Sequence, residues 1–203
     1  MGTRKIAPAI AAGCPVIIKP ASETPLTMLE LMPLLEEAGV PKGLVSVLPS
    51  RNTSKLVDHL LHDNRVRLVS FTGSTEVGRK LLKVASDQVL KTSMELGGNA
   101  PLIVFDDADM ETAVDGCMVA KMRNLGEACT AANRIYVHEN VAEEFKDKFS
   151  QRMGSLKVGN GLDKTVDVGP LVNAETRDKV AYFVKDAIEK GAELSVGGES
   201  IDG

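Results

Sequence analysis

Apolar residues follow two spacings that alternate along the chain. Short apolar runs such as Val16–Ile18 and Leu102–Phe105 are typical of buried strands. Within residues 173–190, by contrast, single apolar residues recur at helical spacing. Strands are predicted at residues 14–19, 44–48, 67–71, 91–96, 101–105, 134–138 and 194–196. Helices are predicted at residues 24–38, 53–62, 74–85, 107–123 and 173–190, and around residues 145–153.

Local signals mark the ends of some of these helices. Thr24 precedes Pro25, so its hydroxyl is expected to cap a helix that has proline in its first turn. Asp107 is expected to cap a later helix, and Ser74 another. Pro33 lies inside the first of these helices and predicts a bend, because it removes a backbone donor.

Strands that alternate with helices predict an α/β fold with largely parallel sheets. Ligands of such folds bind beyond the carboxyl ends of the strands, so chemistry is sought there. Gly97 and Gly98 lie between two predicted strands and allow the chain to change direction. A domain boundary is therefore expected there, between residues 1–96 and 97–203.

Charge and apolar content exclude several classes of function. The 203 residues include 24 Lys and Arg against 28 Asp and Glu, so the net charge of −4 provides no basic surface for nucleic acid. No apolar stretch approaches the ~20 residues of a membrane span. Pro8, Gly13 and Pro15 interrupt the N-terminal segment, which lacks the form of a secretory signal. We expect a cytoplasmic protein that binds neither nucleic acid nor membrane.

The three cysteines suggest different roles. Cys14, Cys117 and Cys129 form no CxxC pair and leave an odd thiol, which argues against a disulfide framework or a zinc site, so no metal is predicted. Cys14 and Cys117 lie in apolar segments and fit a structural role. Cys129 lies among small residues in a loop, where a substrate can approach and loop amide groups favour the thiolate. A structural cysteine is the alternative there too.

Three further places lie at predicted strand ends. Glu95 precedes Leu96 and two glycines, where a carboxylate suits a general base or is simply solvated. Gly73 and Ser74 form a strand-to-helix turn that suits a phosphate or is an ordinary helix cap. Lys19 and Ser22 follow the first strand, where a surface lysine and a turn serine are the alternative.

The order of these motifs closely resembles the aldehyde dehydrogenase superfamily. The resemblance is carried by residues 18–25, 71–78, 95–98 and 126–129, and extends from about residue 6 to residue 198. It implies that residues 1–96 hold part of a Rossmann-like parallel sheet of the cofactor-binding domain. Residues 97–203 would then hold part of the α/β catalytic domain.

The resemblance also implies roles for single residues. Cys129 would attack the aldehyde carbon to form a thiohemiacetal, and Glu95 would activate the water that hydrolyses the thioester. Lys19 and Ser22 would bind the adenosine ribose. Gly73 and Ser74 would lie at the pyrophosphate, and the backbone of Leu96 near the nicotinamide.

Ser22 and Arg123 point to a particular cofactor and substrate. Relatives that prefer NAD tend to have glutamate in place of Ser22, so serine beside Lys19 favours NADP, with NAD possible. Arg123 opens a motif, ending at Cys129, that resembles succinate semialdehyde dehydrogenases, in which this arginine binds the distal carboxylate. Alternatively, Arg123 pairs with a carboxylate at a helix end. Glutarate semialdehyde or a general aldehyde is the other substrate considered.

The sequence departs from the family pattern in several ways. Glu127 replaces a commoner glutamine, and Ala131 replaces a second cysteine of some relatives. Two family segments, which hold the oxyanion asparagine and the nicotinamide ribose, do not occur. We therefore expect an internal part of a longer, homo-oligomeric enzyme. The alternative function is a non-catalytic fragment that at most binds nucleotide.

Overall fold

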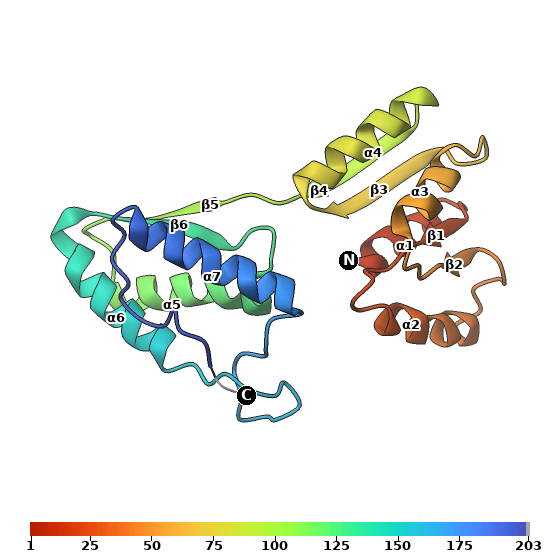
Figure 1. Ribbon diagram of the computed structural model, residues 1–203. Coiled ribbons are helices and arrows are strands. Elements are labelled where there is room, and N and C mark those ends of the chain that lie inside the picture. The colour runs from red at the N-terminus through yellow and green to blue at the C-terminus, as the bar shows by residue number, and fades with distance from the viewer. Residues whose placement is uncertain (202–203) are drawn as a thin grey trace. The chain divides into compact units, whose positions relative to one another are not determined.

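The computed structural model describes residues 1–201 and divides into two compact units, Met1–Gly97 and Gly98–Gly203 (Figure 1). Both units combine helices with short parallel strand pairs, which confirms the predicted α/β class. No helix within the described residues is both long and apolar enough to cross a membrane.

The first part of unit 1 packs helices on a two-stranded parallel sheet. Its elements are α1 (Gly2–Ala11), β1 (Val16–Ile18), α2 (Leu26–Glu37), β2 (Val45–Val47) and α3 (Thr53–Leu61). Strands β1 and β2 pair directly, with Val16 opposite Val45. Ile6 of α1 is buried with Ile18 and Val45, so α1 contributes to the core of this sheet.

Helix α1 was not predicted, and it contains Pro8. Burial of Ile6, which is 3% exposed, stabilises the helix and opposes the cost of the hydrogen bond that the proline removes. Helix α2 likewise continues through Pro33 as one element. The predicted Thr24 cap is wrong, because α2 begins after Pro25 with no side-chain cap.

The second part of unit 1 is a strand-helix-strand unit. It consists of β3 (Leu68–Gly73), α4 (Thr75–Asp87) and β4 (Lys91–Leu96), and α4 lies along the strand pair (Figure 1). The two strands are parallel and paired without interruption, from Leu68 opposite Lys91 to Gly73 opposite Leu96. The carboxyl ends of both strands therefore meet at one edge.

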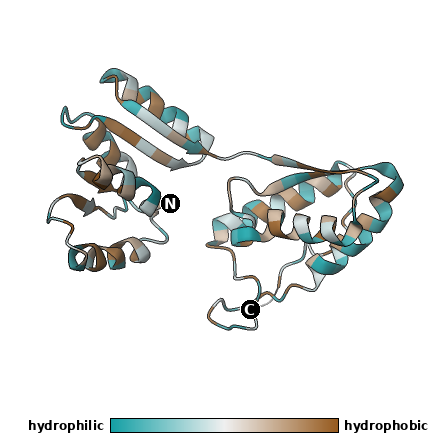
Figure 2. Ribbon diagram, turned by 180° about the vertical axis from the view of Figure 1, so that it is seen from behind, coloured by the Kyte–Doolittle hydropathy of each residue, from teal (hydrophilic) through white to brown (hydrophobic). Residues whose placement is uncertain are grey.

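Unit 2 has a third parallel strand pair with helices around it. Its elements are β5 (Ala100–Val104), α5 (Met110–Met122), β6 (Ala132–Val137), α6 (Ala142–Gly154) and α7 (Ala174–Glu189), with short 3₁₀ helices at Arg123–Gly126 and Glu139–Val141. Val104, Val114, Cys117 and Phe145 form the buried core. Figure 2 shows hydrophobic and hydrophilic positions on the same helices, as in amphipathic helices.

Two local predictions for unit 2 are wrong. Asp109, not Asp107, caps α5, because its Oδ1 accepts from the Thr112 amide at 2.9 Å. Residues 194–196 do not form a strand. They pack by side chains instead, since Val196 lies close to Gly154 of α6, with no backbone partner in the described sheets.

Candidate functional site

The turn between β3 and α4 has the geometry of an anion site. Gly73 ends β3, and Ser74 caps α4 by accepting a hydrogen bond from the Val77 amide to its Oγ at 3.3 Å. Other amide groups of the first turn have no partner further up the helix, and the helix dipole favours negative charge there. The cap prediction for Ser74 is confirmed, and the turn suits a phosphate.

Glu76 adds a negative charge in the same first turn. Its carboxylate pairs with Lys80 at 2.6 Å, and the hydrogen bond from Lys80 lowers the pKa of Glu76. The charge is therefore partly compensated by a neighbour on the same helix.

Leu96 lies at the same edge as this turn. It is opposite Gly73 in the strand register, and a Cβ atom at Gly78 would lie only 2.7 Å from Leu96 Cδ2. Gly78 is buried for this reason, and only a residue without a side chain allows α4 to approach β4 so closely. The structure thus brings together three predicted cofactor residues, Gly73, Ser74 and Leu96.

Glu95 is the penultimate residue of β4 and is exposed. Met94 and Leu96 are partly buried, so the alternation of the strand directs Glu95 to the opposite, open face. In the register Glu95 is opposite Thr72, one residue before the β3–α4 turn. An exposed carboxylate here is accessible to water, as a general base requires.

Lys5 is a cation near this carboxylate that sequence reasoning missed. Its Nζ donates to Ser70 Oγ at 2.8 Å, which connects α1 to β3. Burial lowers the pKa of Lys5, while the negative charge of Glu95 acts in the opposite direction. No sequence signal indicates this neighbour, because it depends on the unpredicted helix α1.

Lys19 and Ser22 follow β1 on the other sheet of unit 1. The last strand bond is donated by the Leu48 amide to Ile18 O at 2.8 Å, so Lys19 is the first residue beyond the ladder. Lys19 is partly buried and Ser22 is exposed. They lie beyond the carboxyl end of a parallel strand, where ligands of α/β folds bind.

Cys129 lies in an irregular loop between α5 and β6. Asn124, Leu125 and Gly126 all have left-handed backbone angles, with φ of 52°, 56° and 79°. Two turn hydrogen bonds order the rest: the Glu127 amide donates to Asn124 O at 3.0 Å and the Ala131 amide to Ala128 O at 2.9 Å. Cys129 itself is exposed.

Arg123 begins the same loop and is exposed. No ion pair of Arg123 is found within residues 1–201, so the alternative of a carboxylate partner at the helix end has no support there. A guanidinium and a thiol are thus presented by one loop, while Glu95 belongs to the other unit.

The other two cysteines differ from Cys129 in their surroundings. Cys117 is 1% exposed in the core of unit 2, and burial raises the pKa of its thiol. Cys14 is exposed, and its Sγ lies 3.6 Å from Ala12 O. The structural role predicted for Cys117 is consistent with this burial.

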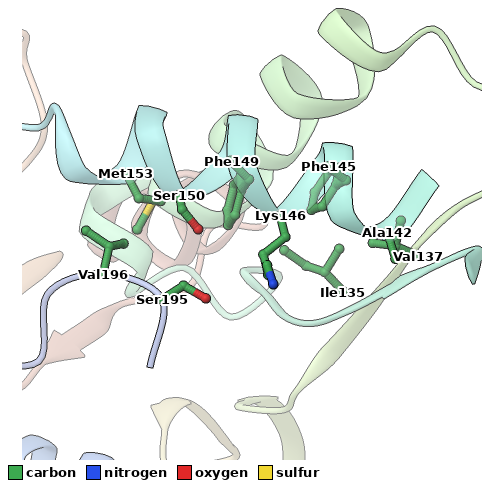
Figure 3. A pocket seen from close by; sticks show the side chains of 10 residues that line it. All are labelled: Ile135, Val137, Ala142, Phe145, Lys146, Phe149, Ser150, Met153, Ser195 and Val196. Atoms are coloured by element: carbon green, nitrogen blue, oxygen red, sulfur yellow. The ribbon is translucent and has the colours of Figure 1, made fainter. Parts of the chain in front are cut away.

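Within the described residues, neither the hollow beside α6 nor a metal-binding cluster coincides with the predicted site residues. Between β6, α6 and the C-terminal segment lies an open hollow of about 450 Å³, lined by residues such as Phe145, Phe149 and Val196 (Figure 3). It includes none of the predicted site residues. Within the part of the chain that the structure describes, no group of three acidic, cysteine or histidine residues is placed to hold a metal ion.

Comparisons with known proteins identify the family of the chain. The family model described as the aldehyde dehydrogenase family matches residues 1–203. The succinate-semialdehyde dehydrogenase of Paenarthrobacter nicotinovorans is 53% identical over 203 residues, which are 100% of this chain and 45% of that protein. The glutarate-semialdehyde dehydrogenase of Pseudomonas putida is 45% identical over 203 residues, 42% of its length.

A solved structure shows the same fold. The crystal structure of an E. coli NADP-dependent enzyme superimposes with a TM-score of 0.95 at 45% identity, and the match covers 98% of this chain and 41% of that one. The chain thus spans less than half the length of these relatives. Because the family model matches it from end to end, the chain belongs to the aldehyde dehydrogenase family.

Proposed function

We propose that this chain provides the nucleophile, the general base and part of the cofactor site of an enzyme that oxidises a short aldehyde with a distal carboxylate. The observation that carries the proposal is the loop of unit 2, which presents the exposed Cys129 thiol and the exposed Arg123 guanidinium, for which no ion pair is found among residues 1–201. Succinate semialdehyde is the first candidate substrate, as in the name of the Paenarthrobacter relative.

Cys129 is the proposed nucleophile. Its thiolate adds to the aldehyde carbon, which forms a C–S bond and a thiohemiacetal oxyanion. Loss of hydride from that carbon gives a thioester. A nicotinamide nucleotide, when bound, would accept this hydride.

Glu95 is the proposed general base. Its exposed carboxylate takes a proton from water as the oxygen of that water attacks the thioester carbonyl; the C–S bond breaks, which releases the carboxylic acid and the Cys129 thiolate. The half-buried neighbours Met94 and Leu96 fix the strand, so the Glu95 side chain projects from its open face.

Arg123 is the proposed substrate-binding residue. A guanidinium binds a planar carboxylate through paired hydrogen bonds, which favours aldehydes that have a carboxylate at the far end. Glutarate semialdehyde is the second candidate, favoured by the name of the Pseudomonas putida relative. It differs by one methylene, so the same guanidinium suits both.

The cofactor residues are Gly73, Ser74 and Leu96, together with Lys19 and Ser22. The start of α4 suits the pyrophosphate, and the close approach of Gly78 to Leu96 keeps the turn and the end of β4 together. Ser22 has no charge to repel a 2′-phosphate, and Lys19 attracts one, so we propose NADP with NAD as the alternative. The structural relative is named as NADP dependent.

The assignment of the units follows from these roles. Residues 1–96 form part of the cofactor-binding domain, and residues 97–203 part of the catalytic domain. We further expect a homo-oligomer in the cytoplasm as the working form of the whole protein.

The test is turnover together with thiol labelling. The purified chain is mixed with succinate semialdehyde and NADP, and NADPH absorbance is followed while the alkylation of each cysteine is measured by mass spectrometry. Turnover that disappears in Cys129→Ala and persists in Cys14→Ala supports the proposal. Labelling of Cys129 with no turnover favours the alternative, a part that at most binds nucleotide.

A further inference from the structure

A chain of side-chain hydrogen bonds closes the base of the Cys129 loop, defined as residues 123–131. Lys121 Nζ donates to Asn133 Oδ1 at 2.6 Å, and Asn133 Nδ2 donates to Asn99 Oδ1 at 3.2 Å. Lys121 lies in the last turn of α5, before the loop, and Asn133 lies in β6, after it. One contact thus connects the two stems of the loop. We call Lys121, Asn133 and Asn99 the loop latch.

A β-bulge makes the Asn133 side chain available. In the register of β5 and β6, Ala100 is opposite Ala132 and Pro101 is opposite Arg134, so Asn133 is an extra residue on β6. Pro101 has no N–H group, so the bulge beside it disrupts no hydrogen bond that Pro101 would donate to β6. A bulge leaves its extra residue unpaired and redirects the side chain. Asn133 can therefore bond to neighbours outside the sheet.

A further hydrogen bond fixes the Asn99 end of the latch. Arg134 Nε donates to Asn99 O at 3.0 Å, so the residue after the bulge binds the backbone of the residue that Asn133 contacts. Asn99 directly precedes β5. The latch is therefore joined to both strands of the pair.

The near end of the latch passes beside the strained part of the loop. A Cβ atom at Gly126 would lie 3.2 Å from Lys121 O and 3.6 Å from Lys121 Nζ. Asn124 and Leu125 precede this glycine with left-handed angles, which are unfavourable for a leucine. Such a conformation persists only where the surrounding structure holds it.

We propose that the loop latch positions the Cys129 thiol. By joining the stems of the loop, it keeps residues 124–126 in their left-handed conformation, and that conformation sets where Cys129 is presented. Lys121 and Asn133 are positioning residues that act through the backbone of the loop. The inference rests on the proposed function in one respect, the role of Cys129 as the nucleophile.

Amide hydrogen exchange measures the latch directly. Lys121→Met keeps the length of the side chain and removes the donor, and Asn133→Leu removes both bonds at similar volume. Both variants remove the hydrogen bond between Lys121 and Asn133, and each is expected to speed the exchange of the Glu127 and Ala131 amides about fivefold, the effect of losing that one bond. Exchange in α6 and the melting temperature stay unchanged. Because both residues belong to one latch, the double variant exchanges no faster than the faster single variant.

Two further variants separate positioning from a general effect of charge. Lys121→Arg retains a donor of similar reach and is expected to restore slow exchange. Lys83→Met removes the same charge from α4, where the Lys83 side chain has no hydrogen bond or ion pair within the described residues. It is expected to leave the loop amides at the wild-type rate. If Lys121→Met does not fold, Asn133→Leu tests the same contact from the β6 side.

The chemical readout is alkylation of Cys129 by iodoacetamide as a function of pH, with Cys14 as the internal reference. Latch variants are expected to change the pH profile of Cys129 and leave that of Cys14 in place. Wild-type exchange at Glu127 and Ala131 together with a wild-type Cys129 profile in Lys121→Met or Asn133→Leu would overturn the latch. Failure of the proposed function is a different result, because it appears as turnover that survives in Cys129→Ala whatever the exchange rates are.

Discussion

The β3–α4 turn and the Cys129 loop are held in place by different means. The turn is regular: Ser74 caps a helix, and Gly78 lets that helix pack closely on Leu96. The loop is irregular, with three successive left-handed residues between two ordered elements. Backbone amide groups at a helix start are sufficient to bind an anion, whereas presenting a thiol away from helix and strand requires side-chain restraints from the surrounding structure.

Among the changes that test this difference, removal of the Arg123 guanidinium from the Cys129 loop should have the largest effect, and the effect is on substrate binding. Arg123→Ala is expected to raise the KM for succinate semialdehyde about 10- to 100-fold, because a hydrogen-bonded charge contributes ~1.5–3 kcal/mol. Steady-state kinetics with succinate semialdehyde and with propanal provide the measurement. Equal losses for both aldehydes would show that Arg123 does not bind the distal carboxylate.

A methyl group at Gly78 tests the packing of the turn. Gly78→Ala places a Cβ 2.7 Å from Leu96 Cδ2 and is expected to destabilise the chain by about 1–3 kcal/mol, measured by urea unfolding.

Gly116 of α5 provides the matched control. No atom lies within 4 Å of a Cβ at that position, so Gly116→Ala should stabilise its helix by about 0.5–1 kcal/mol. A similar loss of stability in both variants would contradict the close contact between Gly78 and Leu96.

The Ser74 cap is expected to contribute less. Ser74→Ala removes the acceptor for the Val77 amide and should cost about 1 kcal/mol, seen as a lower urea midpoint. Ser86→Ala, at the other end of α4, is the comparison, because the hydroxyl of Ser86 donates to Lys83 O and caps nothing at the helix start. An unchanged midpoint in Ser74→Ala would argue against the cap.

The smallest expected effect concerns the charge of Glu127 in the Cys129 loop. Glu127 is exposed and lies two residues from Cys129, so we expect its negative charge to slow the alkylation of Cys129 through a screened interaction. Glu127→Gln is expected to raise the rate of Cys129 alkylation near neutral pH about twofold. A rate that falls, or a parallel change at Cys14, would refute this electrostatic influence.

Much of the fold could be predicted from local pattern. The strand end at Leu96 and the cap at Ser74 follow from apolar runs and capping residues, which act within a few positions of the chain. Helix α1 could not be predicted, because Pro8 is a local signal against a helix and the burial of Ile6 that stabilises α1 involves distant strands.

The candidate site was predictable in its residues and less so in its geometry. Cys129 and Glu95 could be selected by motif. The left-handed Leu125 could not be predicted, since the conformation of a non-glycine residue there depends on tertiary restraints. The contact between Lys121 and Asn133 depends on a bulge opposite Pro101, and bulges in parallel pairs are rare.

Pre-steady-state kinetics of Glu95→Gln test the central claim most directly. If Cys129 is the nucleophile and Glu95 the base, mixing this variant with succinate semialdehyde and NADP should form NADPH once per chain and then stop, because the thioester is not hydrolysed. Mass spectrometry should find the succinyl group on Cys129. Continuous turnover of Glu95→Gln at the wild-type rate, or a burst that persists when Cys129 is also replaced by alanine, would contradict the account.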